Sequence, residues 1–351
     1  MVKRTAIGFI LSLTITSAIG CRPDITGAPA EQAPAASVST LANAWTRKTP
    51  MPSARYFPAV TLVKTPSGKP LIFVMGGSSA SPMSVIAYDP VANTWTNRAP
   101  MPDNRTGTDG AVFLNGKIYV FGGYSGDGSS GPISPTLVYT VATDTWQTLS
   151  INGLSASGAV GLIAGQVYVL NGTEGGGLTT SALHRYDPAT DGWTRLTEDP
   201  IQQNFPGYGV INGKLYVAGG MNDGGGVQGF LNVYDPATDA WTAKAPMPTA
   251  SAVAGSTVIN GKLYVFGGVN NVVSDTLTSW TTLSTTQIYD PTTDTWEYGV
   301  PLLNTRQGLA AAAAQNTGGE SFAFLVGGAA PFANGAPALR NNEKFDPSAP
   351  N

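Results

Sequence analysis

One block of residues recurs six times along this chain, and the recurrence constrains the fold more than any other feature of the sequence. Each copy contains two short apolar runs that end in a pair of small residues. The pairs are Gly76-Gly77, Gly122-Gly123, Asn171-Gly172, Gly219-Gly220, Gly267-Gly268 and Gly327-Gly328. Successive pairs lie roughly 50 residues apart, and a unit of that length cannot bury a hydrophobic core alone. The 351 residues therefore predict one domain of stacked repeats and not two or three separate domains.

An aromatic residue and then a tryptophan follow the small pair. The aromatic positions are Tyr88, Tyr139, Tyr186, Tyr234, Tyr289 and Phe345, and the tryptophans are Trp95, Trp146, Trp193, Trp241 and Trp296. In most copies Asp-Pro comes directly after the aromatic residue. Proline cannot donate a ladder hydrogen bond, so the aromatic residue ends one strand and the tryptophan lies on the next. Four recurring aspartates between them are interpreted as turn residues and not as catalysts: Asp144, Asp191, Asp239 and Asp294.

Asn-Gly dipeptides join the two apolar runs in three copies, at Asn115-Gly116, Asn212-Gly213 and Asn260-Gly261. Asn-Gly favours a type I′ turn, because both of its residues accept positive φ. The two runs are therefore predicted to form a β-hairpin, whose strands we call a and b. The aromatic residue then ends strand c, and the tryptophan lies on strand d.

The small pair, the aromatic residue with Asp-Pro, the tryptophan and a following Pro-Met-Pro recur in register from residue 44 to residue 347. In this combination the chain resembles the kelch-repeat family. The resemblance implies an all-β fold, a six-bladed kelch β-propeller with four antiparallel strands in each blade around a central axis. Residues 44–351 are expected to form this domain.

The two ends of the repeat region are expected to share one blade. The last copy supplies strands a, b and c, and it ends at Phe345-Asp346-Pro347 before any tryptophan. Trp45 stands ahead of the first copy and has the context of a strand d without a strand c. The N-terminal strand is therefore predicted to complete the sixth blade and close the ring, which removes an open sheet edge.

The first 43 residues have the pattern of export and anchoring segments. Lys3 and Arg4 precede an apolar stretch too short to span a bilayer comfortably, so residues 1–20 are predicted to be a signal peptide. The stretch ends at Cys21 in a pattern that resembles a bacterial lipobox, in which the cysteine is acylated; an ordinary signal-peptidase site is the alternative. A Pro/Ala/Ser-rich composition predicts a lipidated flexible tether over residues 21–43. The expected location is the cell envelope, with membrane contact through the lipid anchor only.

Composition excludes several functions. A net charge of −3 offers no basic face for nucleic acid. Some kelch propellers are copper oxidases, which need two histidines and a tyrosine–cysteine pair, whereas this chain has one histidine, His184, and one cysteine. No metal or other cofactor is predicted. The sequence also contains no phosphate loop, dinucleotide fingerprint or Gly-x-Ser-x-Gly motif.

One face of the propeller is expected to carry the function. In an antiparallel blade the d–a and b–c connections lie at one end, and the short a–b and c–d turns lie at the other. The b–c segments differ widely among the copies, and loop variation on a repetitive scaffold is where binding residues concentrate. We call the face with the d–a and b–c connections the mouth, and we expect ligands to bind there.

Three arginines occupy equivalent positions just before strand a in the neighbouring blades 6, 1 and 2: Arg306, Arg55 and Arg105. They are predicted to form a crescent at the mouth, where their planar guanidinium groups suit bidentate pairing with a carboxylate or phosphate. The alternative is that this arginine is a structural position that braces neighbouring loops.

The b–c connections contribute the remaining candidates for ligand binding, which are Tyr124, Glu174, Asn222, Asp223, Asn270 and Trp280. Trp280 is the one tryptophan outside the repeat, and it lies in the longest of these segments. With Tyr124 and Phe332 it is a candidate aromatic platform for a sugar. The alternative is that Trp280 only anchors its own loop.

Two functions fit these features. The first is a cell-envelope protein, without catalytic activity, that recognises a glycan or protein ligand through the d–a and b–c loops. The second is a cofactor-free sugar mutarotase or epimerase that acts on a carboxylated sugar, because exported kelch propellers of similar architecture interconvert sialic acid anomers or epimers. Such a reaction needs only a positioned acid and base.

Overall fold

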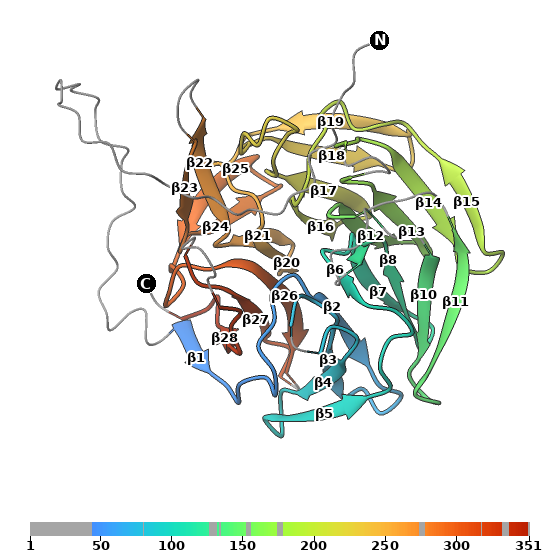
Figure 1. Cartoon of the computed structure of the whole chain (residues 1–351). Coiled ribbons are helices and arrows are strands. Elements are labelled where there is room, and N and C mark those ends of the chain that lie inside the picture. Colours follow the sequence, from blue (N-terminus) through green and yellow to red (C-terminus); the bar gives the residue numbers. More distant parts are fainter. Residues whose placement is uncertain are drawn as a thin grey trace, which may run out of the picture. The chain divides into compact units, whose positions relative to one another are not determined.

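The computed structural model describes residues 44–79, 81–125, 132, 135–151, 156–173, 178–273, 278–316, 318–331 and 337–349. The elements of these residues are all strands, in six four-stranded antiparallel sheets and two two-stranded ribbons. Figure 1 shows the six sheets as blades around a central axis. Over the described ranges we find no helix of the length and hydrophobicity that a membrane span requires.

In each blade strand a lies nearest the axis, and strands b, c and d follow in order towards the outside (Figure 1). Blade 1 is β2 (Ala59–Lys64), β3 (Pro70–Met75), β4 (Val85–Asp89) and β5 (Thr94–Arg98). Blade 2 is β7 (Gly110–Leu114), β8 (Lys117–Phe121), β10 (Pro135–Thr140) and β11 (Thr145–Ile151). Blade 3 is β12 (Ala159–Ile163), β13 (Gln166–Leu170), β14 (Leu183–Asp187) and β15 (Gly192–Arg195).

The second half of the ring repeats this order. Blade 4 is β16 (Gly207–Ile211), β17 (Lys214–Ala218), β18 (Leu231–Asp235) and β19 (Ala240–Lys244). Blade 5 is β20 (Gly255–Ile259), β21 (Lys262–Phe266), β24 (Thr286–Asp290) and β25 (Thr295–Gly299). Blade 6 is β26 (Gln307–Gln315), β27 (Ser321–Ala329), β28 (Asn342–Phe345) and β1 (Trp45–Arg47). The six-bladed, four-stranded fold predicted from the repeat is therefore confirmed.

The N-terminal strand closes the ring, as predicted. Strand β1 pairs antiparallel with β28, and Trp45 lies opposite Phe345 in the register. This is the register that Tyr88 and Trp95 adopt within blade 1. The Trp45 ring lies 4.7 Å from the Phe345 ring and is 4% exposed. Both ends of the propeller are thus held in one sheet.

Trp95, Trp146, Trp241 and Trp296 each also fasten their blade to the preceding one through a hydrogen bond from Nε1 to a backbone carbonyl. Trp146 Nε1 donates to Ala99 O (2.9 Å), and Ala99 N donates to Asp144 Oδ1 (2.8 Å). The Tyr139 hydroxyl donates to the same carboxylate. Equivalent bonds surround Asp239 and Asp294. The four recurring aspartates have φ near +50°, so they are turn residues as predicted.

The hydrophobic core lies mainly between neighbouring blades. One cluster joins Phe73 and Met75 of blade 1 to Val120 and Tyr139 of blade 2, and the rings of Phe73 and Tyr139 are 5.6 Å apart. Because every blade shares its core with its neighbours, a missing outer strand exposes apolar surface on two blades.

Replacement of the closing tryptophan, Trp45→Ala, is expected to lower the free energy of unfolding by about 3–5 kcal/mol, since a large buried side chain leaves a cavity. Chemical denaturation of the variant and the parent chain measures the difference. Val91→Ala is the control, because Val91 is 78% exposed in a turn and should leave stability unchanged. Equal midpoints for Trp45→Ala and Val91→Ala would contradict closure by β1.

Candidate functional site

A circle of six equivalent residues surrounds the axis at the mouth, five in d–a connections and the sixth, Gly308, at the start of β26. All six have left-handed backbone conformations, with φ between 54° and 61°: Phe57, Gly107, Ser157, Phe205, Val253 and Gly308. Non-glycine residues rarely adopt this conformation, and aromatic or β-branched residues do so at a cost of about 1 kcal/mol or more. The surrounding structure must therefore impose it.

Backbone hydrogen bonds between blades impose this conformation. Each of the six residues donates its N–H to the carbonyl of the equivalent residue in the neighbouring blade, and the six bonds form a closed circle. The N···O distances run from 2.6 Å between Phe205 and Ser157 to 3.2 Å between Gly107 and Phe57. The circle orients the six residues around the end of the axial channel.

Phe57 and Phe205 meet across the axis from opposite blades, 1 and 4. Their ring centroids are 5.2 Å apart, and both side chains are half-buried. Gly107 and Gly308 flank Phe57 in the circle; a Cβ at Gly308 would lie 3.5 Å from the Phe57 ring, in van der Waals contact. Gly308 thus adds no side chain against the Phe57 ring.

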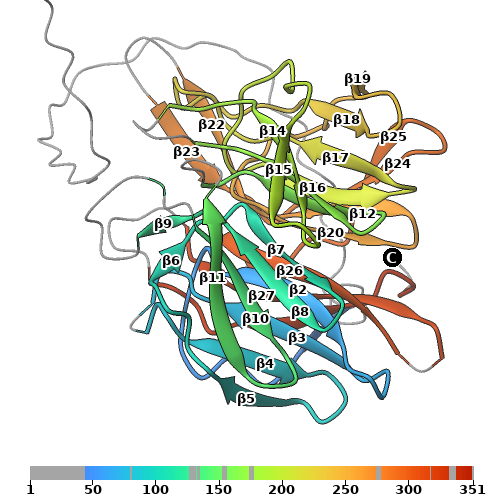
Figure 2. The same ribbon diagram turned by 90° about the vertical axis from the view of Figure 1, so that its right-hand side faces the viewer.

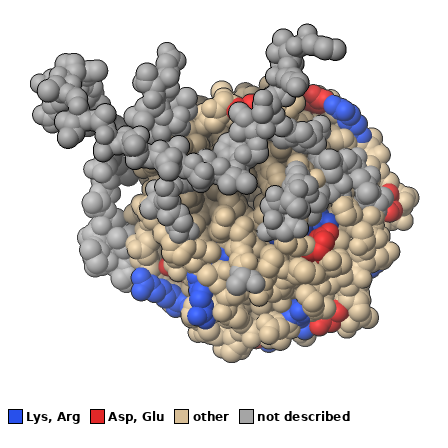
Figure 3. Space-filling view, in the orientation of Figure 1, with Lys and Arg blue, Asp and Glu red and all other residues tan. Residues whose placement is uncertain are grey.

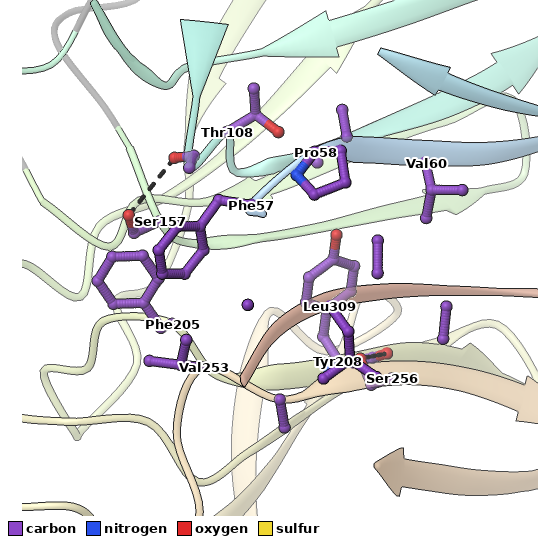
Figure 4. A pocket seen from close by; sticks show the side chains of 18 of the residues that line it. Phe57, Pro58, Val60, Thr108, Ser157, Phe205, Tyr208, Val253, Ser256 and Leu309 are labelled. Carbon is purple, nitrogen blue, oxygen red and sulfur yellow. Dashed lines mark hydrogen bonds between the residues drawn. The ribbon is translucent and has the colours of Figure 1, made fainter. Parts of the chain in front are cut away.

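A cavity of about 100 Å³ lies beside the two phenylalanines, lined by residues of all six blades. In Figure 4, Phe57 and Phe205 lie at its loop end, and Tyr208 and Ser256 lie further along the strands. Ser256 Oγ bonds both Tyr208 N and Tyr208 O (2.7 and 2.9 Å), which joins blades 4 and 5. Burial, with a smaller contribution from the nearby Asp109 carboxylate, raises the pKa of the Tyr208 phenol. The phenol is therefore neutral at physiological pH.

A chain of polar contacts runs around the mouth from blade 2 to blade 4. Tyr124 Oη donates to Thr173 Oγ1 (2.9 Å), which donates to Asn204 Oδ1 (2.6 Å). Asn204 Nδ2 donates to Thr179 Oγ1 (2.7 Å), and Thr179 N donates to Asp223 Oδ1 (2.7 Å). Two of the predicted residues, Tyr124 and Asp223, are thus brought together through three residues that the sequence did not single out.

The three predicted arginines are completely buried. Each has no exposed surface and donates from Nη1 to the carbonyl of the first glycine of its own blade's pair: Arg55 to Gly76 (3.1 Å), Arg105 to Gly122 (3.1 Å) and Arg306 to Gly327 (3.3 Å). Burial lowers the pKa of Arg55 to about 10. The expectation that these guanidinium groups line the mouth is corrected, because they hold the d–a and b–c connections together.

Several of their other donors are also used inside the protein, whereas Arg55 Nε and Arg306 Nε are buried without a hydrogen-bond partner. Arg105 makes a bidentate pair with Asp103 (2.7 and 2.8 Å), and Arg306 Nη2 donates to the buried Glu343 (2.5 Å). In blade 5, Ser251 Oγ donates to Gly267 O (2.9 Å), so a hydroxyl replaces the guanidinium at the equivalent position. This placement agrees with the bracing alternative.

The other predicted residues are dispersed over the mouth. Asn222 is exposed and accepts from Gly226 N (3.0 Å) within its own turn, and Asn270 accepts from Asn271 N (2.7 Å). Asp223 is exposed apart from its contact with Thr179. Glu174, Phe332 and Cys21 lie outside the described residues.

Trp280 lies on a strand and not in an irregular loop. Strands β22 (Val269–Val273) and β23 (Thr278–Thr282) form an additional hairpin between β21 and β24, with Trp280 opposite Asn271. The half-buried indole packs against a cluster of Ala252, Val253 and Val269 that also contacts Phe57 and Phe205. This placement agrees with the anchoring alternative for Trp280. Figure 2 shows β22, β23 and the ribbon of β6 (Arg105–Thr106) and β9 (Tyr124–Ser125) on one side of the molecule.

Phe57, Phe205 and Tyr208 were not predicted from the sequence. No spacing singles them out, because their proximity depends on the ring that brings blades 1 and 4 face to face. Asp199 was not predicted either, although the sequence carries a signal for it. Asp199-Pro200 stands where other copies have Met-Pro, and those methionines are buried.

Asp199 is a buried carboxylate between blades 3 and 4, 2% exposed. It accepts hydrogen bonds from Ile201 N (3.0 Å), Asn232 Nδ2 (2.7 Å) and Gln203 Nε2 (3.1 Å). Burial raises its pKa to about 6, and the hydrogen bonds oppose this shift only in part. Asp199 therefore ionises close to neutral pH.

The mouth carries little charge. Figure 3 looks onto this face, and most of the described atoms around the axis belong to uncharged residues. Among the described residues, no group of three or more His, Cys, Asp or Glu side chains is arranged to hold a metal ion. Aromatic rings, hydroxyls and amides are thus the groups that this surface offers to a ligand.

Six four-stranded blades, the repeated tyrosine–tryptophan register and the closing strand define a kelch-type β-propeller. The family model described as Attractin/LZTR1 beta-propeller matches residues 72–331, and the chain belongs to that family. A solved structure described as "Structure of YjhT" is similar, with a TM-score of 0.72 and 16% sequence identity over 84% of this chain and 95% of that chain. At this identity the likeness concerns the fold alone. No curated protein sequence matches the chain.

The pKa of Asp199 leads to a pH-dependent stability. The folded pKa lies above the value of an unfolded aspartate, so the contribution is fully present below pH 4 and is lost as the pH rises to about 6. Asp199→Asn should abolish this loss, which is on the order of 2–3 kcal/mol. Denaturation curves of both proteins between pH 4 and pH 7 measure it.

Asp290→Asn is the matched control. Hydrogen bonds from Thr292 and Lys262 lower the pKa of Asp290 to about 2, so its ionisation does not change between pH 4 and pH 7. The difference between this variant and the parent chain should vary little over that range, because only the residual protonation of the unfolded aspartate near pH 4 changes. An equally small variation for Asp199→Asn would show that folding does not raise the pKa of Asp199.

Proposed function

We propose that this protein is a cell-envelope binding protein that recognises a glycan or protein ligand through the mouth of its propeller. The observation that carries the proposal is the convergence on one face of the aromatic pair, the axial cavity and the polar chain from Tyr124 to Asp223. Convergent polar groups around an apolar cavity are the usual features of a binding site. Membership of a kelch-type propeller family supports a binding role.

We further propose export and anchoring through a lipid on Cys21, with residues 21–43 as the tether. The support is the charged and apolar pattern of residues 1–20 and the position of the single cysteine directly after it. Cys21→Ala is expected to move the protein from the membrane fraction to the soluble fraction of cells, as an immunoblot reports. Unchanged membrane association of this variant would contradict acylation at Cys21.

A pair of matched substitutions tests the mouth. Asp223→Arg places a bulky cation on the exposed surface of the mouth, and Val91→Arg places the same group in the c–d turn of blade 1, on the opposite face. Exposed changes of this kind should leave stability within about 0.5 kcal/mol. An array of bacterial envelope glycans, read with the parent chain and both variants, measures binding.

Binding that is weakened at least about tenfold by Asp223→Arg, and unchanged by Val91→Arg, is the expected result. The reverse pattern would place the binding surface on the other face and overturn the proposal. The sugar isomerase alternative has a separate readout, which is accelerated equilibration of a freshly dissolved sugar anomer in NMR spectra when the protein is added.

A further inference from the structure

The floor of the mouth is built without charge. Residues of all six blades line the axial cavity, and none of the described lining residues carries a formal charge. Four of the six b–c segments, residues 78–87, 124–138, 221–233 and 269–288, contain no lysine or arginine, and the cations of the other two, Arg185, Arg340 and Lys344, do not line the cavity. Arg55, Arg105 and Arg306 donate hydrogen bonds to glycine carbonyls inside the protein.

This arrangement selects against an ionised ligand group. An ionised carboxylate loses its hydration on entering an apolar cavity, and several kcal/mol of that cost remain unless a cation or several donors replace the water. The described floor offers neutral hydroxyls, such as those of Tyr208 and Ser256, and no cation. An uncharged group with an apolar surface avoids this cost.

The aromatic pair supplies the complementary attraction. Phe57 and Phe205 occupy positions where the chain has glycine in blades 2 and 6, and they hold left-handed backbone conformations that favour glycine. Their rings are half-buried, so part of each ring faces outward over the cavity. Aromatic rings bind the apolar C–H face of a sugar ring through contact area.

We propose that Phe57 and Phe205 form a subsite for the uncharged ring of a neutral sugar. This proposal rests on the proposed function, in which the mouth is the binding surface. Along the same face, the half-buried Tyr124 and Asn204 provide a hydroxyl and an amide for sugar hydroxyls, and the buried Thr173 and Thr179 hold them in place. The proposal reverses the expectation of a carboxylated ligand, which rested on three arginines that are buried.

Two glycine substitutions isolate the aromatic rings. Phe57→Gly and Phe205→Gly reproduce the residue that blades 2 and 6 carry at this position, and they relieve the left-handed backbone strain. Both variants are therefore expected to fold, which thermal unfolding checks. Phe57→Tyr retains the ring and serves as the conservative variant, and Val91→Ala on the opposite face is the control.

The probes are methyl glycosides of glucose, galactose, mannose and N-acetylglucosamine, each paired with its carboxylated counterpart. Saturation-transfer NMR with the full chain in detergent measures binding at pH 7. A neutral member is expected to bind at least about tenfold more tightly than its counterpart, a difference of about 1.4 kcal/mol. Each glycine variant should lose at least about tenfold in affinity, and Phe57→Tyr should lose less.

Three results would overturn the subsite: equal or tighter binding of the carboxylated probes, binding by both glycine variants as by the parent chain, or no binding of any probe. The proposed function fails on a different measurement. An envelope ligand that is sensitive to Asp223→Arg but insensitive to both glycine variants keeps the mouth as the binding surface and removes only the neutral-sugar subsite. A ligand sensitive to Val91→Arg alone would remove the mouth itself.

Discussion

Six backbone hydrogen bonds, one from each blade to its neighbour, form a closed circle around the axis, and the geometry of the mouth depends on this circle. Each bond requires a left-handed residue, so the strain at Phe57, Ser157, Phe205 and Val253 follows from the need to join neighbouring blades. The circle also brings Phe57 and Phe205, which are 148 positions apart in the chain, into ring contact. A binding surface arises here from the same contacts that hold the blades together.

The buried glycine carbonyls need hydrogen-bond donors, and this need explains why three arginines point into the protein and not onto the mouth. The paired glycines end strand b, and the carbonyl of the first glycine needs a donor that water cannot supply inside the fold. Arg55, Arg105 and Arg306 provide it in three blades, and Ser251 provides it in another. A guanidinium used in this way has no surface left for a ligand. These three arginines therefore add no exposed positive charge to the mouth, although they stand beside it in the sequence.

Features that depend on local chemistry could be predicted. The Asn-Gly turns, the left-handed aspartates and the closing strand follow from backbone preferences and from a repeat that lacks one strand. The β22–β23 hairpin could not be predicted, because residues 269–288 show no turn dipeptide between alternating apolar runs. Among the candidate site residues, Tyr124 and Asp223 lie on the polar chain of the mouth, whereas their three linking partners were missed because those partners come from different blades.

The sequence by itself determined the architecture: the period sets the blade, the count of blocks sets the ring, and Trp45 sets the closure. These properties repeat along the chain and involve contacts within one block or between adjacent ones. Only the tertiary structure decided that the three arginines point into the protein, that the Asp199 carboxylate is buried, and that the rings of Phe57 and Phe205 meet at the axis. Burial and orientation at those positions depend on atoms supplied by distant segments, and a residue type carries no information about them until the ring is closed.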